Sequence, residues 1–328
     1  MSRVPAKLQG PVPAPPAPAP ARAPAGPDAA SEVRYRPPRP SVPGVVRDAW
    51  RSRHLVRPMG FRVVAKMYAQ TKLGRSWLVI RPAMDVGGSA LIFGGVLGVS
   101  ARDGTPYVIF LVVGLAGWRL FERTVYWSTR SFDRYARYTR RFVMPLLLLP
   151  IAGAAPALVE FCVYSGIVLL IAAGYLAFDG TLWLESGPQL LAGAGGLVLC
   201  LAMGLGLSLW TSVLNARTRD VRHTMRYVLQ IWMFVTPVLY PLSQLPAGFR
   251  PLAQANPMTS PIELVKYGFL GAGDVQLVPV VTSVAAILAV LAGGLWFFSR
   301  QASHFLGPAG WGRGGATMDD DDDDDYGL

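Results

Sequence analysis

Side chains that could catalyse a reaction or hold a metal are sparse in this sequence. Its three histidines, His54, His223 and His304, are widely scattered, and no metal-ligand spacing occurs. Its two cysteines, Cys162 and Cys200, both lie in apolar runs, where packing as small hydrophobic residues is expected. The chain also lacks a GxxxxGK[ST] phosphate loop. We therefore expect no catalytic site, metal site or cofactor in this chain.

A few charged side chains occur inside apolar runs, where each costs about 2.5–3.5 kcal/mol if it lies at the centre of a bilayer. Arg81 and Asp85 are four residues apart, so on a helix they can pair with one another. Glu160 has no partner nearby in the sequence. The sequence leaves open whether Glu160 lies near the membrane interface or faces a polar cavity.

The composition indicates that these runs belong to a membrane protein. Of the 328 residues, 52% are hydrophobic and only 16% are charged. Several runs approach or exceed the roughly 18–20 residues that cross a bilayer as a helix, whereas a soluble core would use shorter runs. The net charge of +11 is concentrated in short loops. Nucleic-acid binding is disfavoured, because no zinc spacing, basic helix or aromatic RNA-binding signature accompanies this charge.

The pattern predicts an all-α polytopic membrane protein with six transmembrane helices. The predicted spans cover about residues 78–99, 107–127, 154–178, 188–214, 227–242 and 276–298. Arginines cluster after the second, fourth and sixth spans, at Arg119, Arg123, Arg130, Arg134, Arg137, Arg140, Arg141, Arg217, Arg219, Arg222, Arg226 and Arg300. Because the opposite loops contain few basic residues, the positive-inside rule predicts that both termini are cytoplasmic.

Regions outside the spans have distinct compositions. Residues 1–43 are rich in proline and alanine and predict a disordered cytoplasmic tail, and residues 301–328 predict a cytoplasmic tail with a run of aspartates. Residues 44–77 predict an amphipathic helix at the membrane interface, although a flank that only anchors the first span explains them equally well. The membrane domain is predicted over residues 78–300. The apolar positions of the interface helix recur at helical spacing: Phe61, Val64 and Tyr68.

Small residues recur at every fourth position of the fourth span, which predicts a helix face that another backbone can approach closely. These residues are Ala192, Gly196, Cys200, Gly204 and Ser208. The sixth span repeats the spacing with Ala285, Ala289 and Gly293. Both sets are predicted to be packing faces.

The fifth span is short for a bilayer. Residues 227–242 would cover only about 24 Å as a helix, and Pro237 is expected to bend it. In the following segment, "SPIE" from Ser260 to Glu263 reads as a helix N-cap, a first-turn proline and a capping-box glutamate, in a helix that ends near Gly271. A short span followed by a short helix predicts re-entrant helices and a gate. The gate residues predicted from this pattern are Pro237, Pro241, Ser260 and Glu263.

Several short motifs occur in a recognisable order. They are Leu73–Gly74, Trp77 and Pro82 before and within the first span, "WRLFERTVYWSTRSF" and "FVMPLLLLP" around the second, and Arg219–Asp220, Pro237, Tyr240–Pro241 and Asn256–Pro257 around the fifth. Over about residues 57–300 this order resembles the permease subunits of type-2 ABC transporters that export lipid-linked polysaccharides, such as O-antigen, teichoic acid, capsule and mycobacterial galactan. The sequence departs from the family at "MYAQTK", where a basic-aromatic pair is usual, and in its arginine-rich loop after the second span.

The resemblance implies partners and sites, and it adds Asn256 and Pro257 to the predicted gate. It implies two copies of this chain with a pore between them, and two separate ATPase subunits that bind ATP and Mg²⁺. We expect the ATPase to dock on the N-terminal helix and on the cytoplasmic elbow after the second span. The elbow residues are Ser131, Phe132, Asp133, Arg134 and Arg137.

A polysaccharide conduit would use aromatic rings, which offer apolar faces to sugar C–H groups. The candidate pore-lining residues are Trp118, Phe121, Trp232, Phe234 and Tyr240. The alternative is that these side chains lie at membrane interfaces or face lipid.

The predicted function is ATP-driven export of a polyprenyl-linked polysaccharide across the bacterial inner membrane, with membrane lipids and the glycan as further partners. One alternative is a drug or small-lipid exporter permease of the same superfamily. A more distant one is a polyprenyl-phosphate-dependent membrane glycosyltransferase, which would need clustered acidic residues. The acidic residues of the predicted outward loops are instead dispersed, at Asp103, Asp179, Glu185 and Asp274.

Overall fold

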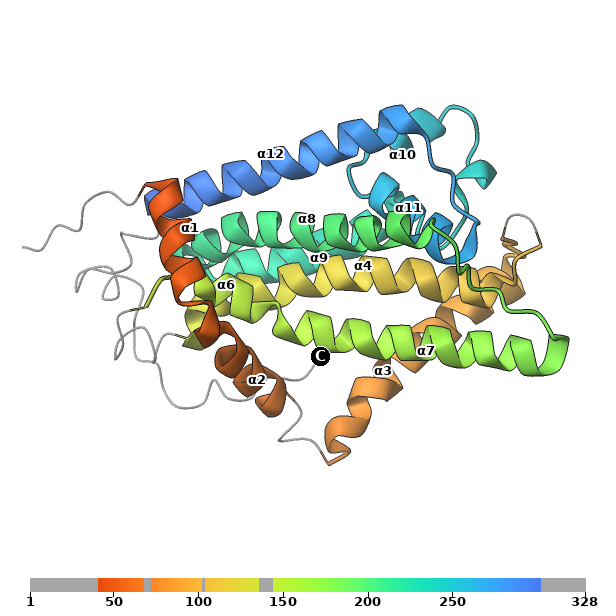
Figure 1. The fold of residues 1–328 in the computed structure, drawn as a ribbon, viewed down its shortest axis with the longest axis horizontal. Helices are drawn as coiled ribbons and strands as arrows, with labels where there is room; N and C mark the ends of the chain where they lie inside the picture. The colour runs from red at the N-terminus through yellow and green to blue at the C-terminus, as the bar shows by residue number, and fades with distance from the viewer. Residues whose placement is uncertain (1–40, 68–71, 102–103, 136–143, 302–328) are drawn as a thin grey trace, which may run out of the picture. The chain divides into compact units, whose positions relative to one another are not determined.

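The computed structural model describes residues 41–67, 72–101, 104–135 and 144–301. All the described residues belong to one compact unit. These described residues form helices, turns and loops without a β-strand, so the predicted all-α class is confirmed for them (Figure 1). Residues 1–40 of the predicted N-terminal tail, the loop around Arg137 and the aspartate run lie outside the described residues. The last two residues of the predicted tail, Val42 and Pro43, already belong to a helix.

Four helical stretches among the described residues are long and apolar enough to cross a membrane. They are Gly74–Val96, Leu148–Asp179, Leu190–Arg217 and Leu277–Gln301. The first contains α3 (Trp77–Ser89) and its π-helical continuation η3 (Ala90–Val96), and the second contains α6 (Leu148–Gly153) and α7 (Ala155–Asp179). The third is α8 (Leu190–Arg217) and the fourth is α12 (Leu277–Gln301). They correspond to the first, third, fourth and sixth predicted spans.

The other two predicted spans are also helical, but their composition or length differs. The helix α4 (Tyr107–Thr129) has 23 residues, and its second half carries Arg119, Glu122 and Arg123. We predicted that Arg119 and Arg123 belong to a loop after the second span, and this was wrong: the helix continues through both. The helix α9 (Asp220–Val235) has only 16 residues, so it is about 24 Å long.

The core of the bundle is built around α4. This helix packs against α7, α8 and α11 (Thr259–Leu270), and it is buried along most of its length. Figure 1 shows α4, α7, α8, α9 and α12 running side by side, with α3 inclined to them. Helices α1 (Val42–Arg51) and α2 (Val56–Lys66) lie at one end of the bundle, and α10 (Arg250–Ala255) and α11 lie at the other. The central position of α4 explains why its charged half must find partners inside the protein.

The small-residue face of α8 is confirmed as a packing face. A β-carbon on Gly196 would lie 2.6 Å from the carbonyl oxygen of Pro261 in α11, and one on Gly204 would lie 2.9 Å from Cβ of Thr124 in α4. The repeat predicted for the sixth span was wrong in part, because Ala285 and Ala289 are exposed. The residues of α12 that are buried begin with Ser283, which does not belong to the predicted repeat.

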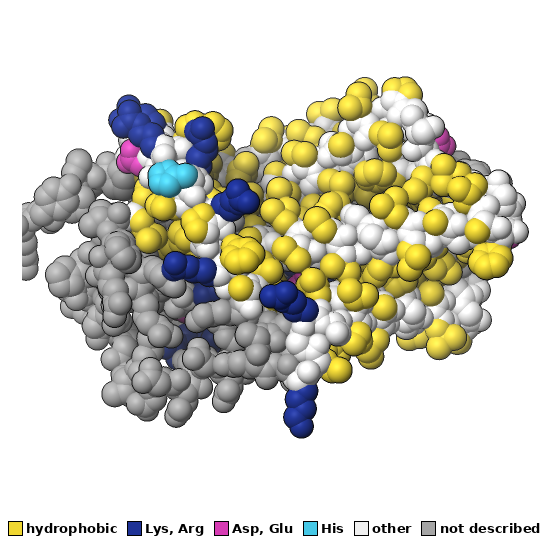
Figure 2. Space-filling view, turned by 60° about the horizontal axis from the view of Figure 1, so that its bottom comes forward, with side chains coloured by type: hydrophobic (Ala, Val, Ile, Leu, Met, Phe, Trp, Pro, Cys, Tyr) yellow, Lys and Arg dark blue, Asp and Glu magenta, His cyan; other side chains and the backbone are white. Residues whose placement is uncertain are grey.

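The N-terminal region forms two helices rather than one, joined by a short 3₁₀ turn. Of its predicted apolar face, Phe61 is 72% exposed, and the residues that this region buries against the protein are Val63 and Met67. The reason is that α2 packs on α6 and α7, and Gly60 allows close approach to Ala155. Figure 2 shows Lys and Arg side chains gathered toward the end that carries α1 and α2, while the rest of that face is largely hydrophobic.

Candidate functional site

The helix α9 ends in the segment where the sequence predicts a gate. The helix ends at Val235, and Thr236 is extended, with ψ 135°. A residue before proline avoids the helical region, so Pro237 stops the helix rather than bending it. The predicted bounds of the fifth span, 227–242, were therefore wrong. The helix begins at Asp220 and ends at Val235.

Asn256 connects the end of α9 to the beginning of α11. Its Oδ1 accepts hydrogen bonds from Nε1 of Trp232 (2.9 Å) and from the backbone N–H of Met258 (3.0 Å). Its Nδ2 donates to Oγ1 of Thr236 at 2.8 Å. One buried amide thus satisfies groups on both sides of the break. Such a network fixes one arrangement of the two segments as long as all its members remain paired.

Lys266 is the second connection across the break, and its side chain is fully buried. Its ammonium group donates a hydrogen bond to the carbonyl oxygen of Pro237 and lies 3.3 Å from Oε1 of Glu263. The same group lies 4.2 Å from the ring centre of Phe110 on α4, which is a cation–π distance. Glu263 also accepts the N–H of Asp274 at 2.7 Å. Lys266 is one of the few basic residues in the predicted outward loops, and the sequence around it gives no sign of this role at the break.

The geometry at the beginning of α11 differs from the prediction. The helix begins at Thr259, so Ser260 is its second residue and makes no cap. Its hydroxyl instead lies 3.0 Å from that of Ser283 on α12. Glu263 binds Lys266 and Asp274 rather than closing a capping box. The predicted end of this helix near Gly271 is confirmed. Gly271 follows its last residue and has a positive φ of 69°, which favours glycine.

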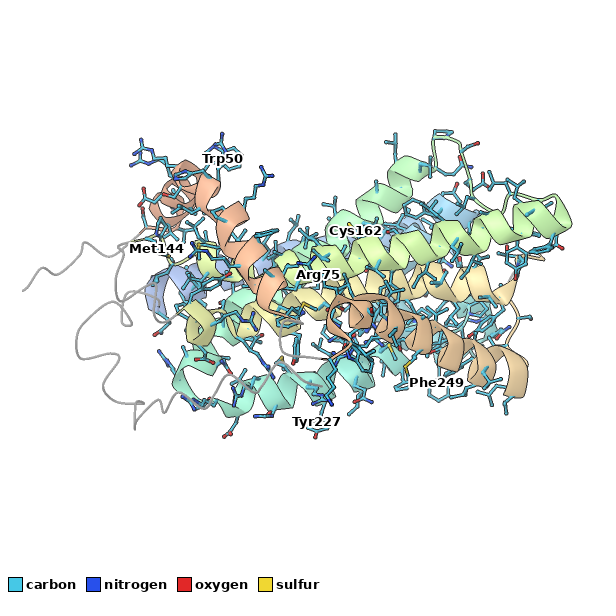
Figure 3. All side chains as sticks on the ribbon, turned by 90° about the horizontal axis from the view of Figure 1, so that it is seen from below. Trp50, Arg75, Met144, Cys162, Tyr227 and Phe249 are labelled. Carbon is cyan, nitrogen blue, oxygen red and sulfur yellow. The ribbon has the colours of Figure 1, made fainter. Side chains whose placement is uncertain are left out.

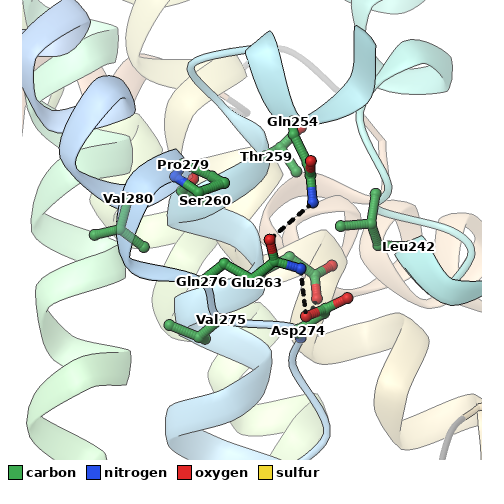
Figure 4. Close-up of a pocket in the computed structure, with 10 residues that line it drawn as sticks. All are labelled: Leu242, Gln254, Thr259, Ser260, Glu263, Asp274, Val275, Gln276, Pro279 and Val280. Atoms are coloured by element: carbon green, nitrogen blue, oxygen red, sulfur yellow. Dashed lines mark hydrogen bonds between the residues drawn. The ribbon is translucent and has the colours of Figure 1, made fainter. Parts of the chain in front are cut away.

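The predicted gate residues therefore lie around one polar network. Pro241 precedes the short turn η4 (Leu242–Gln244), and Pro257 directly follows Asn256. Figure 4 shows the neighbouring cavity, where Gln276 bonds both Gln254 and Asp274. That cavity has a volume of about 10 Å³, which holds about one water molecule and excludes a sugar. The region can act as a mechanical element, and it is not a ligand pocket in a single chain.

The predicted pore-lining aromatics separate into two groups. Trp118, Phe121 and Trp232 form one cluster, with ring-centre distances of 5.1, 5.4 and 6.4 Å, and the first two are fully buried. Phe234 is 51% exposed, and Tyr240 donates its hydroxyl to the carbonyl of Phe234 at 2.9 Å. The cluster therefore packs α9 against α4.

Most of α9 points away from the bundle. Leu229 is the buried residue of this helix, whereas Tyr227 and Ile231 are 65% and 66% exposed. Figure 3 shows Tyr227 directed outward. The exposed face of α9 is available for contact outside this chain, and Phe234 belongs to it.

The elbow after α4 is largely built into the fold. Ser131 and Phe132 are buried, and the ring of Phe132 lies 5.9 Å from that of Phe298. Asp133 accepts a hydrogen bond from Nδ2 of Asn215 at 2.8 Å. Burial raises the pKa of Asp133, and the Asn215 hydrogen bond and nearby arginines partly offset this. Arg134 lies over the Trp127 ring at 4.7 Å, and Arg137 is outside the described residues. Asp133 and Arg134 are the partly exposed members of the set.

A network of charged side chains crosses α3, α4 and α7. Arg119 pairs with Asp85 (2.6 Å) and with Glu122 (2.5 Å). Asp85 therefore does not pair with Arg81 in the described structure, which corrects the prediction. Arg123 lies 2.8 Å from Glu160, so Glu160 finds its partner on a neighbouring helix. Of the two possibilities left open for Glu160, a polar cavity agrees with the structure, since its side chain lines a cleft together with other charged residues. The signal that could have revealed the network is the presence of three charges within five residues of a predicted span.

Comparison with known sequences shows the family to which the chain belongs. A family model described as ABC-2 type transporter matches residues 59–270, from α2 to the end of α11. The chain belongs to this family. It is 23% identical over 240 residues to the O-antigen export system permease protein RfbA of Klebsiella pneumoniae, which covers 73% of this chain and 88% of that protein. It is 26% identical over 219 residues to the protein of the same name from Myxococcus xanthus, covering 66% and 80%.

As a member of the ABC-2 transporter family with four apolar helices of spanning length among its described residues, the chain is a multi-pass membrane permease. The matched residues contain both the α9–α11 break and the charged network of α3, α4 and α7. A permease of this family moves its cargo without transforming it, which agrees with the scarcity of catalytic side chains in the sequence.

Proposed function

We propose that this protein is the permease subunit of an ATP-driven exporter that carries a polyprenyl-linked polysaccharide outward across the bacterial inner membrane. The observation that supports this most directly is the likeness to permeases named for O-antigen export, over about three quarters of the chain. The packing agrees with a translocating role, because a buried polar network spans a break in the helical bundle. Backbone breaks at membrane depth are tolerated where protein or a water-filled cavity covers them.

In the proposed topology α4 and α9 complete six crossings, and both termini are cytoplasmic. The 23 residues of α4 give about 35 Å of helix, enough to span the hydrocarbon core. Its charges are tolerable because each has a partner on α3, α4 or α7. The short α9 would be completed by the extended segment and by the re-entrant helices α10 and α11. The amphipathic region before α3 would lie at the cytoplasmic interface, with the exposed Phe61 directed toward lipid.

The proposed assembly contains two copies of this chain and two ATPase subunits that supply ATP and Mg²⁺. The exposed face of α9, including Phe234, is the proposed lining of a pore between the two copies. Opening of that pore would require movement at the α9–α11 break. The proposed contact with the ATPase is the elbow around Asp133 and Arg134, together with the N-terminal helices.

The ATPase contact predicts a specific loss. Arg134→Glu reverses the charge of a partly exposed elbow residue and should reduce co-purification of the ATPase subunit at least about tenfold. A contact between like charges costs an interface more than the roughly 1.4 kcal/mol that corresponds to a factor of ten in affinity. Arg134→Lys keeps the charge and should retain most of the ATPase. Monodisperse elution of both variants controls for the loss of the Trp127 contact. Equal recovery of the ATPase with Arg134→Glu and the wild type would refute the assignment.

Depletion of this protein in its host tests the function itself. We expect a polyprenyl-linked polymer to accumulate on the cytoplasmic face, detected by extraction of lipid-linked glycans and analysis of their sugars. Inactivation of the ATPase subunit at its Walker motif should reproduce this accumulation, because export needs both proteins. If depletion instead left glycans unchanged and increased sensitivity to a drug, the small-molecule exporter alternative would replace this proposal.

A further inference from the structure

A polar cleft opens between three helices on the side of the bundle where α3 lies. Its volume is about 390 Å³, and its lining combines charged, aromatic and apolar residues. Arg81, Trp77 and Asp85 come from α3, Arg119 and Arg123 from α4, and Glu160 and Tyr164 from α7. The cleft uses the first nine residues of α3, the middle and the following turn of α4, and the first half of α7.

The three arginines of the cleft differ in how many of their N–H groups have a partner. Arg119 uses three of its nitrogens on Asp85 and Glu122, so it has little capacity left. The Nε of Arg123 lies 2.8 Å from Glu160 without the alignment of a hydrogen bond. Among the described residues Arg81 has no carboxylate within ion-pair distance, and its guanidinium lies 5.5 Å from the centre of the Trp77 ring.

The network contains equal numbers of arginines and carboxylates, but the carboxylates lie close to only two of the three arginines. Asp85 and Glu160 are held by arginines of α4, and Tyr164 donates its hydroxyl to Asp85 at 2.6 Å. Three arginines therefore face three carboxylates once Glu122 is counted, yet no described carboxylate lies within ion-pair distance of Arg81. A guanidinium presents five N–H donors in a planar fork that matches a phosphate group. The side of the cleft formed by Arg81 and Arg123 thus has unused donors for an anion.

The surroundings favour an anion that carries a long apolar chain. Met84, which also lines the cleft, is 67% exposed, and Val79 on the same helix and Leu91 on its continuation η3 are 54% and 68% exposed. An apolar chain can continue from the cleft along these side chains, whereas a free inorganic ion would gain nothing from them. We propose that this cleft binds the phosphate group of a lipid, held by Arg81 and Arg123, with the hydrocarbon chain lying along α3.

Two sources supply this chemistry in a bacterial membrane: bulk phospholipid and the polyprenyl phosphate group of a lipid-linked cargo. The site itself is derived from the cleft and does not depend on which polymer is exported. Its placement in the cytoplasmic leaflet rests on the proposed topology. In that orientation the cleft lies on the side from which an outward-moving lipid-linked cargo arrives.

The test is retention of lipid by the purified full-length chain, reconstituted in phosphatidylcholine nanodiscs and examined by native mass spectrometry. One sample contains undecaprenyl phosphate, a second contains undecaprenol, and a third contains phosphatidylglycerol. Undecaprenyl phosphate should be retained at least about tenfold better than undecaprenol, the effect of one or two charge-assisted hydrogen bonds. Arg81→Ala should remove this preference, and Arg81→Lys should restore part of it.

Arg75→Ala is the matched control, because Arg75 is an exposed arginine of the turn that leads into α3 and does not line the cleft (Figure 3). It should retain the wild-type preference. Retention of phosphatidylglycerol as strong as that of undecaprenyl phosphate, and equally dependent on Arg81, would support the site and identify bulk phospholipid as its source. Equal retention of undecaprenol and its phosphate, or an equal loss in Arg75→Ala and Arg81→Ala, would overturn the proposal. A failure of this test leaves polymer accumulation on depletion unaffected, so the two proposals can fail separately.

Discussion

Lys266 shows how one side chain can hold a broken helix in place. Its ammonium group has no contact with water and is satisfied by Glu263, by the Pro237 carbonyl and by the Phe110 ring. Replacement by methionine keeps much of the volume but leaves the Glu263 carboxylate buried without its cation. Breaking a buried pair in this way costs about 3–5 kcal/mol. We therefore expect Lys266→Met to lower the thermal stability of the detergent-solubilised protein strongly, as followed by its melting curve.

The double variant Lys266→Met with Glu263→Gln separates the ion pair from packing. Because the glutamine side chain carries no charge, we expect the second substitution to recover a substantial part of the stability lost in Lys266→Met. Lys72→Met removes an exposed lysine and should leave the melting temperature unchanged. A Lys266→Met protein that melts with the wild type would show that the break is held by other contacts.

Packing between helices is decided by the face of α8 that meets α11 and α4. Gly195 and Gly196 are adjacent, yet an added β-carbon meets no atom within 4 Å at Gly195 and lies 2.6 Å from the Pro261 carbonyl at Gly196. Gly196→Ala should therefore force the two helices apart and cost about 1–3 kcal/mol. Gly195→Ala should be neutral or stabilising by up to about 1 kcal/mol, because alanine favours a helix over glycine. Comparison of the two melting curves checks the opposite signs, and similar shifts would contradict the described approach of α8 to α11.

The elements with a strong apolar signal could be placed from the sequence alone. The predicted spans 154–178, 188–214 and 276–298 lie within a few residues of α7, α8 and α12. The predictions that were wrong concern contacts between elements. Asp85 was assigned to a partner four residues away, but it pairs with Arg119 from a helix that the sequence does not place beside it. Likewise, the buried face of α2 is chosen by α6 and α7 and not by its own spacing.

The position of the candidate site could be predicted from the sequence, but the hydrogen bonds within it could not. Pro237 was identified as a helix bend, Glu263 from a capping pattern and Asn256 from the family resemblance, and they do lie together around the break. The bonds that join them were not foreseen, because Asn256 acts through its amide on Trp232 and Thr236 rather than as part of a turn alone. Lys266 was missed because a lysine in a predicted outward segment gives no sign that it will be fully buried.

For the whole molecule, the proposed six crossings place the ends of the helices on definite sides of the membrane. Figure 1 shows the end of α8 and the beginning of α9 at the same end of the bundle as α1 and α2, and the turn between α7 and α8 at the opposite end. The exposed Thr181 lies in that turn, and the exposed Thr218 joins α8 to α9. With both termini cytoplasmic, Thr181 must face outward and Thr218 inward.

Cysteine accessibility in living cells tests this orientation. Cys162 and Cys200 are first replaced by alanine, which suits the exposed and the buried position alike, so that one cysteine can be added at a time. A membrane-impermeant maleimide should label Thr181→Cys in intact cells, because that turn faces the outside. It should label Thr218→Cys only after the membrane is permeabilised. Labelling of both positions in intact cells would place both ends of α8 on the outer side, so α8 would not span the membrane. Labelling of Thr218→Cys alone would invert the orientation and would place the charged cleft in the outer leaflet.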